Sequence, residues 1–290
     1  MHPASSIIVF TSASGIGFGL LFFLGTIFPA PKGTEAFIFF VIAYLLAIGG
    51  LISSTFHLGR PERALKAFKQ WKTSWLSREA WLATGALFCM AIYGGGLVFY
   101  EVALRFVGIL GAFLSLATVY STSMIYAQLK AIPRWNTFLT PLLFLVISLS
   151  GGSMLVGLYE FALIFLTVTG VVQVIYWIKG DSAFLKSGTN MKSATGLGEK
   201  GTVRHFAPPH TGTNYLLNEF VYVVGRKHSL ILRFSSLVMM IGIPVSILMV
   251  ATNYWLYICA ALFHLIGVVI ARWLFFAQAE HLVGLYYGKR

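Results

Sequence analysis

Residues 36–56 read AFIFFVIAYLLAIGGLISSTF, a run of 21 residues that contains no charged side chain. A helix needs about 20 mostly apolar residues to cross the hydrocarbon core of a bilayer. Comparable runs lie near residues 6–28, 80–100, 105–127, 138–158, 160–178, 232–252 and 254–276. The sequence therefore predicts an all-α, polytopic membrane protein with eight transmembrane helices, built as a single membrane domain over residues 1–290.

The composition of the 290-residue chain agrees with this prediction and excludes a soluble fold. Hydrophobic residues make up 58% of the chain and charged residues only 10%, whereas soluble domains carry about 25% charged residues. The two cysteines, Cys89 and Cys259, lie inside apolar runs, which excludes a disulfide scaffold. An iron–sulfur cluster needs about four thiolates, so we expect none in this chain.

Basic residues gather on one side of the predicted helices. The chain carries 21 Lys and Arg against 9 Asp and Glu, and only Lys32 and Arg105 of the 21 fall on the side away from the termini. Loops rich in Lys and Arg stay in the cytoplasm. We therefore predict that both termini, a basic amphipathic loop at 58–78 and a long loop at 180–231 face the cytoplasm. Topology accounts for the positive charge, so we expect no nucleic-acid partner.

The run at 36–56 continues into His57-Leu58-Gly59-Arg60-Pro61. An imidazole titrates near neutral pH, and ionisable groups at membrane depth are candidates for function because their burial is costly. Gly59 and Pro61 break the helix directly after His57, and irregular backbone at this depth must line protein or water. His57 is thus either a proton-exchanging group or an interfacial histidine without a role.

Residues 62–77 predict a basic amphipathic helix in the membrane interface. Apolar side chains recur there at steps of three and four, with Lys and Arg on another face, a pattern typical of helices that lie on a bilayer. Span three is then expected to begin at Ser77, a suitable N-cap residue. Glu79 falls in its first turn, where the helix dipole favours a carboxylate. Glu79 is either a cap or a proton partner for a bound redox ring.

Small and hydroxyl side chains predict contacts between helices. Gly15 and Gly19 in the first run, and the glycines at 94–96 in the third, indicate close helix packing. The fourth run carries a polar stripe on one helix face, formed by Ser115, Thr118, Thr122 and Tyr126. Hydroxyls in membrane helices commonly bond their own backbone or a neighbouring helix, which is the interpretation that we favour for this stripe.

Two ionisable residues lie within the eighth predicted span, His264 near its middle and Arg272 toward its end. Arg272 is expected either to snorkel to the surface or to pair with a buried carboxylate, and His264 has no assigned role. A b-type haem between helices needs two histidines that face each other at similar depth, but His57 and His264 lie at different depths. We therefore expect no haem and no metal site in the chain.

Several of these segments carry a resemblance to a known family. His57-Leu58-Gly59-Arg60-Pro61, Leu76-Ser77-Arg78-Glu79 and Pro133-Arg134-Trp135, which leads to Thr140-Pro141, resemble the membrane-anchor subunits of the dimethyl sulfoxide reductase type (DmsC family). The resemblance implies eight spans in a bacterial inner membrane and no haem. It also implies a complex with a four-cluster, ferredoxin-like iron–sulfur subunit and a molybdopterin catalytic subunit. Electrons would be exchanged with a quinone, either ubiquinone or menaquinone.

Two further stretches are similar to one branch of that family. Met1-His2-Pro3-Ala4-Ser5-Ser6 and Pro208-Pro209-His210-Thr211-Gly212-Thr213-Asn214-Tyr215 resemble the membrane subunits of cytoplasmic sulfite:quinone oxidoreductases. The resemblance implies sulfite oxidation with quinone reduction. The distribution of Lys and Arg predicts that the partners dock on the cytoplasmic side, with the basic loops 58–78 and 180–231 as the docking surface. Three alternatives stay open: a quinol-oxidising anchor of a dimethyl sulfoxide or other reductase, a purely structural anchor without a quinone site, and a transporter. The sequence shows no internal repeat, which argues against the transporter.

The combined prediction is a quinone site near the cytoplasmic face, between spans two, three and four and beneath the 62–77 helix. His57 and Glu79 are predicted to exchange protons with the ring oxygens. Arg60 or Arg78 is predicted to stabilise negative charge on a reduced ring, because a fixed cation suits that role. The set of predicted quinone-binding residues is completed by Gly59, Tyr126 and Trp135.

Overall fold

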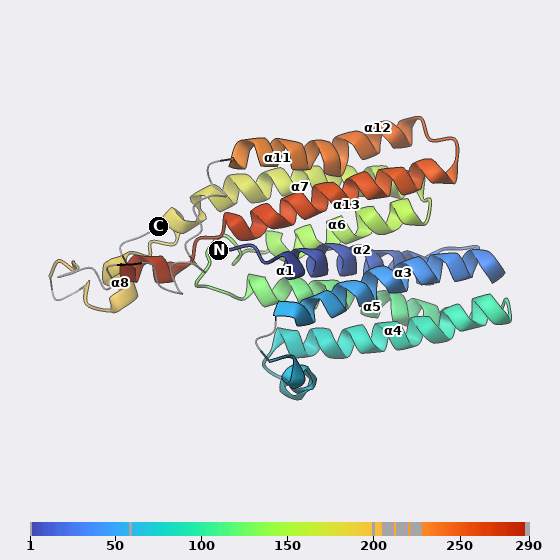
Figure 1. Cartoon of the computed structure of the whole chain (residues 1–290), viewed down its shortest axis with the longest axis horizontal. Helices are drawn as coiled ribbons and strands as arrows, with labels where there is room; N and C mark the ends of the chain where they lie inside the picture. Colours follow the sequence, from blue (N-terminus) through green and yellow to red (C-terminus); the bar gives the residue numbers. More distant parts are fainter. Residues whose placement is uncertain are drawn as a thin grey trace.

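The structure of the chain is a computed structural model that describes residues 2–57, 60–198, 201–204, 212, 220 and 228–287. Within these ranges, the side chains of residues 57 and 61–63 are not described. The described residues form helices and no strands, and the long helices run side by side in an elongated bundle (Figure 1). The prediction of an all-α, polytopic membrane protein is confirmed.

Seven helical segments in the described ranges are long and apolar enough to cross a membrane. Four of them are single helices: α4 (Trp75–Phe99), α5 (Arg105–Ala127), α7 (Tyr159–Lys186) and α13 (Tyr254–Ala277). The other three are composite. Ser5–Thr26 consists of α1 (Ser5–Val9), the π-helical turn η1 (Phe10–Ser14) and α2 (Gly15–Thr26); Gly33–Phe56 consists of α3 (Gly33–Ser53) and most of the 3₁₀ turn η2 (Ser54–His57); and Ser229–Met249 consists of α11 (Ser229–Leu237), the π-helical turn η5 (Val238–Gly242) and α12 (Ile243–Met249). The eighth apolar helix, α6 (Leu139–Leu155), has 17 residues.

Two of these helices differ in length from the predicted runs. Helix α6 ends at Leu155, before the predicted end at 158, because Gly157 turns the chain with a φ of 79°. Helix α7 continues to Lys186, past the predicted end at 178. Its last turns carry the charged residues Lys179, Asp181 and Lys186. Charged residues end the apolar run from which the span was predicted, but they do not prevent the helix from continuing into water.

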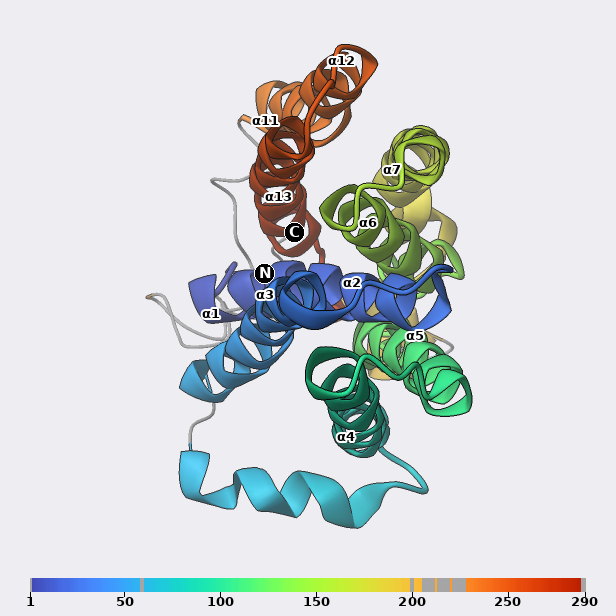
Figure 2. The ribbon, with the colours of Figure 1, turned by 90° about the vertical axis from the view of Figure 1, so that its right-hand side faces the viewer.

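The first span lies at the centre of the bundle, between α3, α5 and α6 (Figure 2). Glycines let its backbone touch the neighbouring backbones, as small residues do in membrane helices. A Cβ atom on Gly19 would lie 1.9 Å from the carbonyl oxygen of Ser148 in α6. The packing prediction is thus confirmed for Gly19, and also for Gly94, where a Cβ would lie 2.8 Å from the Phe40 ring. It is wrong for Gly95, where a Cβ would have no atom within 4 Å because this position faces away from the neighbouring helices.

The segment between α3 and α4 also differs from its prediction. Pro61–Gln70 form a 3₁₀ helix, η3, which runs crosswise to the spans along one side of the bundle, next to the start of α4 (Figure 2). Helix α4 begins at Trp75 with Ser74 at the N-cap position, so a single helix over 62–77 with Ser77 as N-cap is wrong. The Ser77 hydroxyl instead accepts a hydrogen bond from the Gln70 backbone N–H (3.1 Å). This bond ties the end of η3 to α4.

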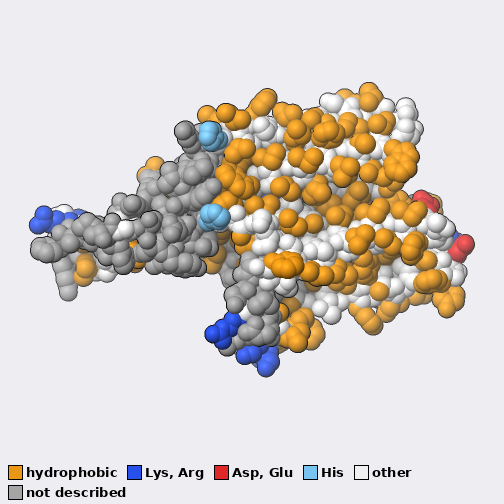
Figure 3. Space-filling model, viewed as in Figure 1, with side chains coloured by type: hydrophobic (Ala, Val, Ile, Leu, Met, Phe, Trp, Pro, Cys, Tyr) orange, Lys and Arg blue, Asp and Glu red, His pale blue; other side chains and the backbone are white. Residues whose placement is uncertain are grey.

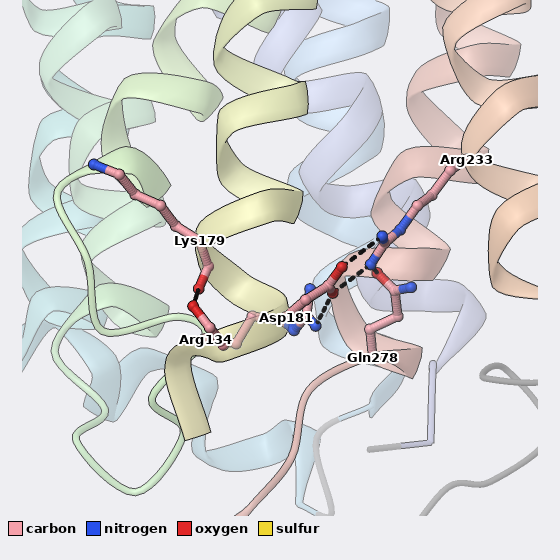
Figure 4. Close-up of polar contacts among 6 residues, drawn as sticks. Arg134, Lys179, Asp181, Arg233 and Gln278 are labelled. Carbon is pink, nitrogen blue, oxygen red and sulfur yellow. Dashed lines mark hydrogen bonds and ion pairs between the residues drawn. The ribbon is translucent and has the colours of Figure 1, made fainter. Parts of the chain in front are cut away.

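Asp181, near the end of α7, joins three other parts of the chain (Figure 4). Its carboxylate accepts hydrogen bonds from Arg134 Nη2 (2.6 Å), in the loop before α6, and from Arg233 Nη1 (2.8 Å) and Nη2 (2.6 Å), in α11. Arg233 also donates to Gln278 Oε1 (3.2 Å), just after α13. The network therefore holds four segments together at one end of the bundle.

Both chain ends lie at that same end of the bundle (Figure 1). Helix α8 (Met191–Thr195) and the 3₁₀ helix η6 (Leu282–Tyr287) extend beyond the spans there, and the Tyr286 hydroxyl donates to the Ala194 carbonyl (2.6 Å). Lys and Arg side chains gather at this end, whereas the Asp and Glu side chains in view lie at the other (Figure 3). The cytoplasmic orientation of this end stays a prediction from charge.

Gly19→Ala is expected to destabilise the bundle, because the new methyl group would overlap the Ser148 carbonyl and force α2 and α6 apart. Overpacking of this kind costs about 1–3 kcal/mol. The thermal unfolding midpoint of the purified chain in detergent measures the loss. Gly95→Ala is the matched control, since its methyl group meets open space and alanine favours helix. Equal midpoints for the two variants would contradict the packing argument.

Asp181→Asn is expected to lower stability by about 1 kcal/mol, because it removes the charge that both Arg134 and Arg233 contact. The thermal unfolding midpoint is measured at low and at high salt. The difference from wild type should shrink at high salt, since screening weakens exposed ion pairs. Glu101→Gln, in the exposed segment between α4 and α5, is the control and should leave the midpoint unchanged.

Candidate functional site

A cavity of about 720 Å³ lies beside the end of α3 and beneath η3. It is enclosed by η1, by α3 with η2, by η3 and by the facing sides of α4 and α5. The lining residues are Phe10, Leu51, Ser54, Thr55, Arg60, Ala64, Ala67, Phe68, Leu76, Glu79, Ala80, Ile125 and Tyr126. An apolar cavity with a few convergent polar groups is the usual form of a small-molecule site. It lies between spans two, three and four, the position that the sequence predicts for a quinone site.

Glu79 is the acidic group of this cavity. It lies in the second turn of α4, beyond the first turn that the sequence predicts, and is only 3% exposed. Its Oε1 is within hydrogen-bond distance of the Thr122 hydroxyl in α5, and the same hydroxyl lies 3.0 Å from the Thr118 carbonyl oxygen. A hydroxyl carries one proton. Thr122 can therefore donate to an ionised Glu79, or accept from a protonated Glu79 while it donates to Thr118.

Arg60 and Tyr126 supply a charged group and a hydrogen-bonding group to the same cavity. Arg60, between η2 and η3, is exposed and lines the cavity. Tyr126, at the end of α5, is 9% exposed and is close enough to Glu79 for the two to interact electrostatically. The cavity thus brings a carboxyl group, a guanidinium group and a phenol to one apolar space.

Trp135 lies behind Tyr126 and does not line the cavity. Its ring is 2% exposed, stacks on Phe275 with centroids 5.0 Å apart, and meets the Tyr126 ring at 5.3 Å. Its Nε1 donates to the Phe275 carbonyl oxygen (3.0 Å). Trp135 therefore holds Tyr126 in place from the loop before α6.

Arg78 is adjacent to Glu79 in the sequence but faces away from this cavity. Its Nε donates to the Trp71 carbonyl (3.0 Å) and its Nη2 to the Lys72 carbonyl (2.7 Å). Its guanidinium carbon lies 4.3 Å from the centre of the Trp75 ring. Consecutive residues of an α-helix point about 100° apart, which explains why the two neighbours serve different spaces.

The remaining predicted site residues are only partly described. His57 ends η2, between the cavity-lining residues Thr55 and Arg60 in the sequence. Its side chain lies outside the described residues, as does Gly59. Their assignment as quinone-binding residues stays a prediction from sequence.

Arg272 is the residue whose environment the sequence did not reveal. It is 2% exposed, so it does not snorkel to the surface, and it pairs with no carboxylate among the described residues. Its guanidinium carbon lies 3.4 Å from the centre of the Phe144 ring. Tyr126 and Tyr176 are close enough to interact with it electrostatically. Both expectations for Arg272 are wrong, because aromatic rings from other helices surround the charge in place of an acid.

His264 has a structural place in the core. It is fully buried, and its Nδ1 lies 2.8 Å from the Met240 carbonyl oxygen within the π-helical turn η5. A π-helical turn leaves carbonyl groups without their usual partner in the helix. The imidazole satisfies one of them, and three residues later a Cβ atom on Gly267 would lie 2.2 Å from the Met240 nitrogen. His264 and Gly267 thus pack α13 against the turn.

The polar stripe of α5 is largely satisfied within its own helix, as expected from the sequence. Ser115 donates to the Gly111 carbonyl and Thr118 to the Leu114 carbonyl, each at 2.8 Å. Thr122 is the exception, since its hydroxyl also reaches Glu79. Two members of the stripe therefore belong to the cavity: Thr122 through its contact with Glu79, and Tyr126 as part of the cavity wall.

The whole chain matches one protein family. Residues 1–288 match the family described as DMSO reductase anchor subunit (DmsC). The chain belongs to the DmsC family. It is also similar to the C subunit of the sulfite dehydrogenase of Allochromatium vinosum, with 31% identity over an alignment of 326 positions that covers 99% of each chain. No solved structure matches it significantly.

Membership in the DmsC family confirms the resemblance seen in the sequence. The chain is a multi-pass membrane anchor subunit of an oxidoreductase complex. An anchor subunit works with partner subunits that carry out catalysis and electron transfer. The cavity beneath η3 is therefore to be judged as a site within such a complex.

Proposed function

We propose that this DmsC-family chain passes electrons between an iron–sulfur partner subunit and the quinone pool, with the quinone head group bound in the cavity beneath η3. The supporting observation is the buried Glu79, which meets Thr122 at the wall of an apolar cavity that Arg60 and Tyr126 also line. A buried carboxyl group is costly in a membrane protein, and a proton-transfer role accounts for its position.

We further propose that the reaction is sulfite oxidation with quinone reduction. Similarity to the C subunit of a sulfite dehydrogenase supports this substrate. Sulfite oxidation would take place on a molybdopterin partner subunit, and the iron–sulfur subunit would deliver the electrons to this chain. The quinone is the substrate of the chain, either ubiquinone or menaquinone.

Each polar group of the cavity has a defined task in this proposal. Quinone reduction takes up two electrons and two protons. Glu79 gives a proton to one ring oxygen, and Thr122 exchanges hydrogen-bond partners as Glu79 changes its ionisation state. Arg60 stabilises negative charge on the ring oxygens, and His57 is the second proton donor. Ala64, Ala67 and Phe68 of η3 cover the ring and limit its contact with water.

Partner docking is proposed for the end of the bundle that carries η3, α8 and η6. The described parts of the basic loops at 58–78 and 180–231 lie at this end, and positive surfaces steer acidic partners. The positive-inside rule predicts that this end faces the cytoplasm, with the chain in a bacterial inner membrane. Protons and electrons then reach the quinone from one side, so the cycle by itself would build no membrane potential.

A quinol-oxidising direction is the second candidate, favoured by the family's description as a DMSO reductase anchor. The same cavity would then release protons from a bound quinol, with Glu79 as the acceptor. Microscopic reversibility allows one set of residues to serve both directions. Partner reduction potentials, which this chain does not contain, decide between them.

Glu79→Gln is expected to lower quinone turnover by about 100-fold, because glutamine keeps the shape of the side chain but transfers no proton. Turnover of a soluble quinone analogue with sulfite is measured on the complex purified with its co-expressed partners. The KM for the quinone analogue should change little, because the substitution leaves the walls of the cavity intact. Glu160→Gln, remote from the cavity on α7, is the matched control and should keep wild-type turnover.

His57→Ala, tested beside these variants, is expected to lose quinone turnover in a complex that still assembles. If both Glu79→Gln and His57→Ala retain the wild-type rate, the chain is a structural anchor and the site assignment is wrong. Quinol oxidation by a sulfoxide without sulfite activity would keep the site and reverse the direction.

The orientation predicts that a fluorescent protein fused to the C-terminus will be fluorescent in bacterial cells, whereas an alkaline phosphatase fused there will be inactive. Folding of the first reporter succeeds in the cytoplasm, and activity of the second needs export. Both fusions are compared with insertions after Glu101, in the segment between α4 and α5 at the other end of the bundle. The reverse pattern of reporter activity would exclude cytoplasmic docking.

A further inference from the structure

A second cavity, of about 700 Å³, lies on the outer side of η3 and α4, where Arg78 points. It is lined by aromatic residues of η3 and its following turn, of α4 and of α5, among them Trp71, Trp75, Trp81 and Tyr120. Phe68 lines both this groove and the cavity that holds Glu79. The groove is thus a separate space on the other side of that ring.

The aromatic walls of the groove are fixed by their own contacts. Trp81 Nε1 donates to the Phe68 carbonyl oxygen (3.0 Å), and the two rings meet edge to face at 5.2 Å. The Trp75 ring meets Tyr120 of α5 at 5.8 Å. Trp71 and Trp81 remain 57% and 54% exposed, at the end of the spans where aromatic residues mark the boundary between hydrocarbon and head groups.

The groove carries one fixed positive charge. Two hydrogen bonds to the carbonyl groups of Trp71 and Lys72 and the face of Trp75 orient the Arg78 guanidinium. Arg78 makes no ion pair with any described residue, and none of the residues that line the groove is acidic. Two further basic residues are exposed nearby in the chain: Lys69 in the last turn of η3 and Lys72 in the turn that follows. An apolar slot whose cation has no carboxylate partner among the described residues is suited to an anionic, partly apolar occupant.

We infer that this groove binds a phospholipid with an anionic head group. The phosphate would meet the oriented guanidinium of Arg78, and an acyl chain would lie along Trp81, Leu82 and Ala117. Basic residues beside a membrane helix favour anionic lipids by this electrostatic attraction. A quinone fits the groove less well, because its ring is neutral and the lining provides a cation but no carboxyl group. Two neighbouring residues of α4, Arg78 and Glu79, would thus serve two different ligands.

The test measures lipid retention by native mass spectrometry on the full-length chain, purified with its co-expressed partner subunits. The protein is equilibrated with equal amounts of phosphatidylglycerol and phosphatidylcholine that carry identical acyl chains. Wild type is expected to retain one phosphatidylglycerol with a preference of about fivefold, the attraction typical of one basic residue at a membrane surface. Arg78→Gln should abolish the preference. Arg78→Lys keeps the positive charge and should retain most of the preference for phosphatidylglycerol. That result would show that the loss of preference in Arg78→Gln comes from the missing charge and not from misfolding.

Arg105→Gln is the matched control. Arg105 also stacks on an aromatic ring, with its guanidinium carbon 4.8 Å from the centre of Phe28, but it begins α5 at the opposite end of the bundle. Its substitution should leave the lipid preference unchanged. Equal retention of the two lipids by wild type, or wild-type retention by Arg78→Gln, would overturn the inference. Displacement of phosphatidylglycerol by a long-chain quinone would overturn it too and assign the groove to the quinone tail.

Discussion

Backbone contact between the first span and its three neighbours sets the positions of the other helices. Gly17 meets Ala47 of α3, Gly19 meets Ser148 of α6, and Gly25 meets Gly108 of α5, each at a distance that leaves no space for a Cβ atom. In a bilayer, where lipid is as apolar as leucine, such close approach supplies the attraction between helices. The same span contains the π-helical turn η1, whose Phe10 forms part of the cavity wall. Packing at the centre thus determines the shape of the site at the end.

Glu79 and Arg272 are both buried inside the bundle, and the fold accommodates each in a different way. Glu79 borders a cavity and has a hydroxyl partner that can either donate or accept. Arg272 is enclosed by aromatic rings and lies near two phenols. The first arrangement is compatible with a change of charge during a reaction, whereas the second maintains a constant positive charge. The proton-transfer role is therefore proposed for Glu79 and not for Arg272.

For a DmsC-family anchor, the arrangement around η3 separates three tasks within a short stretch of chain. The inner side of η3 covers the proposed quinone cavity, its outer side forms the aromatic groove, and its basic residues extend toward the end where partners are proposed to dock. Phe68 stands between the two spaces. A change in the position of η3 when a partner binds would therefore alter the shape of the Glu79 cavity and of the aromatic groove together.

The sequence alone determined the number and approximate ends of the apolar helices, the side that carries the basic residues, and the presence of Glu79 and Tyr126 on spans that form the cavity. Hydropathy and charge are properties of consecutive residues, so a linear pattern contains them. Only the tertiary structure decided that Arg78 faces a separate groove, that Trp135 stands behind Tyr126, and that rings from other helices surround Arg272. Those contacts depend on the rotation and depth of helices packed against partners far away in the sequence, and no local spacing records them.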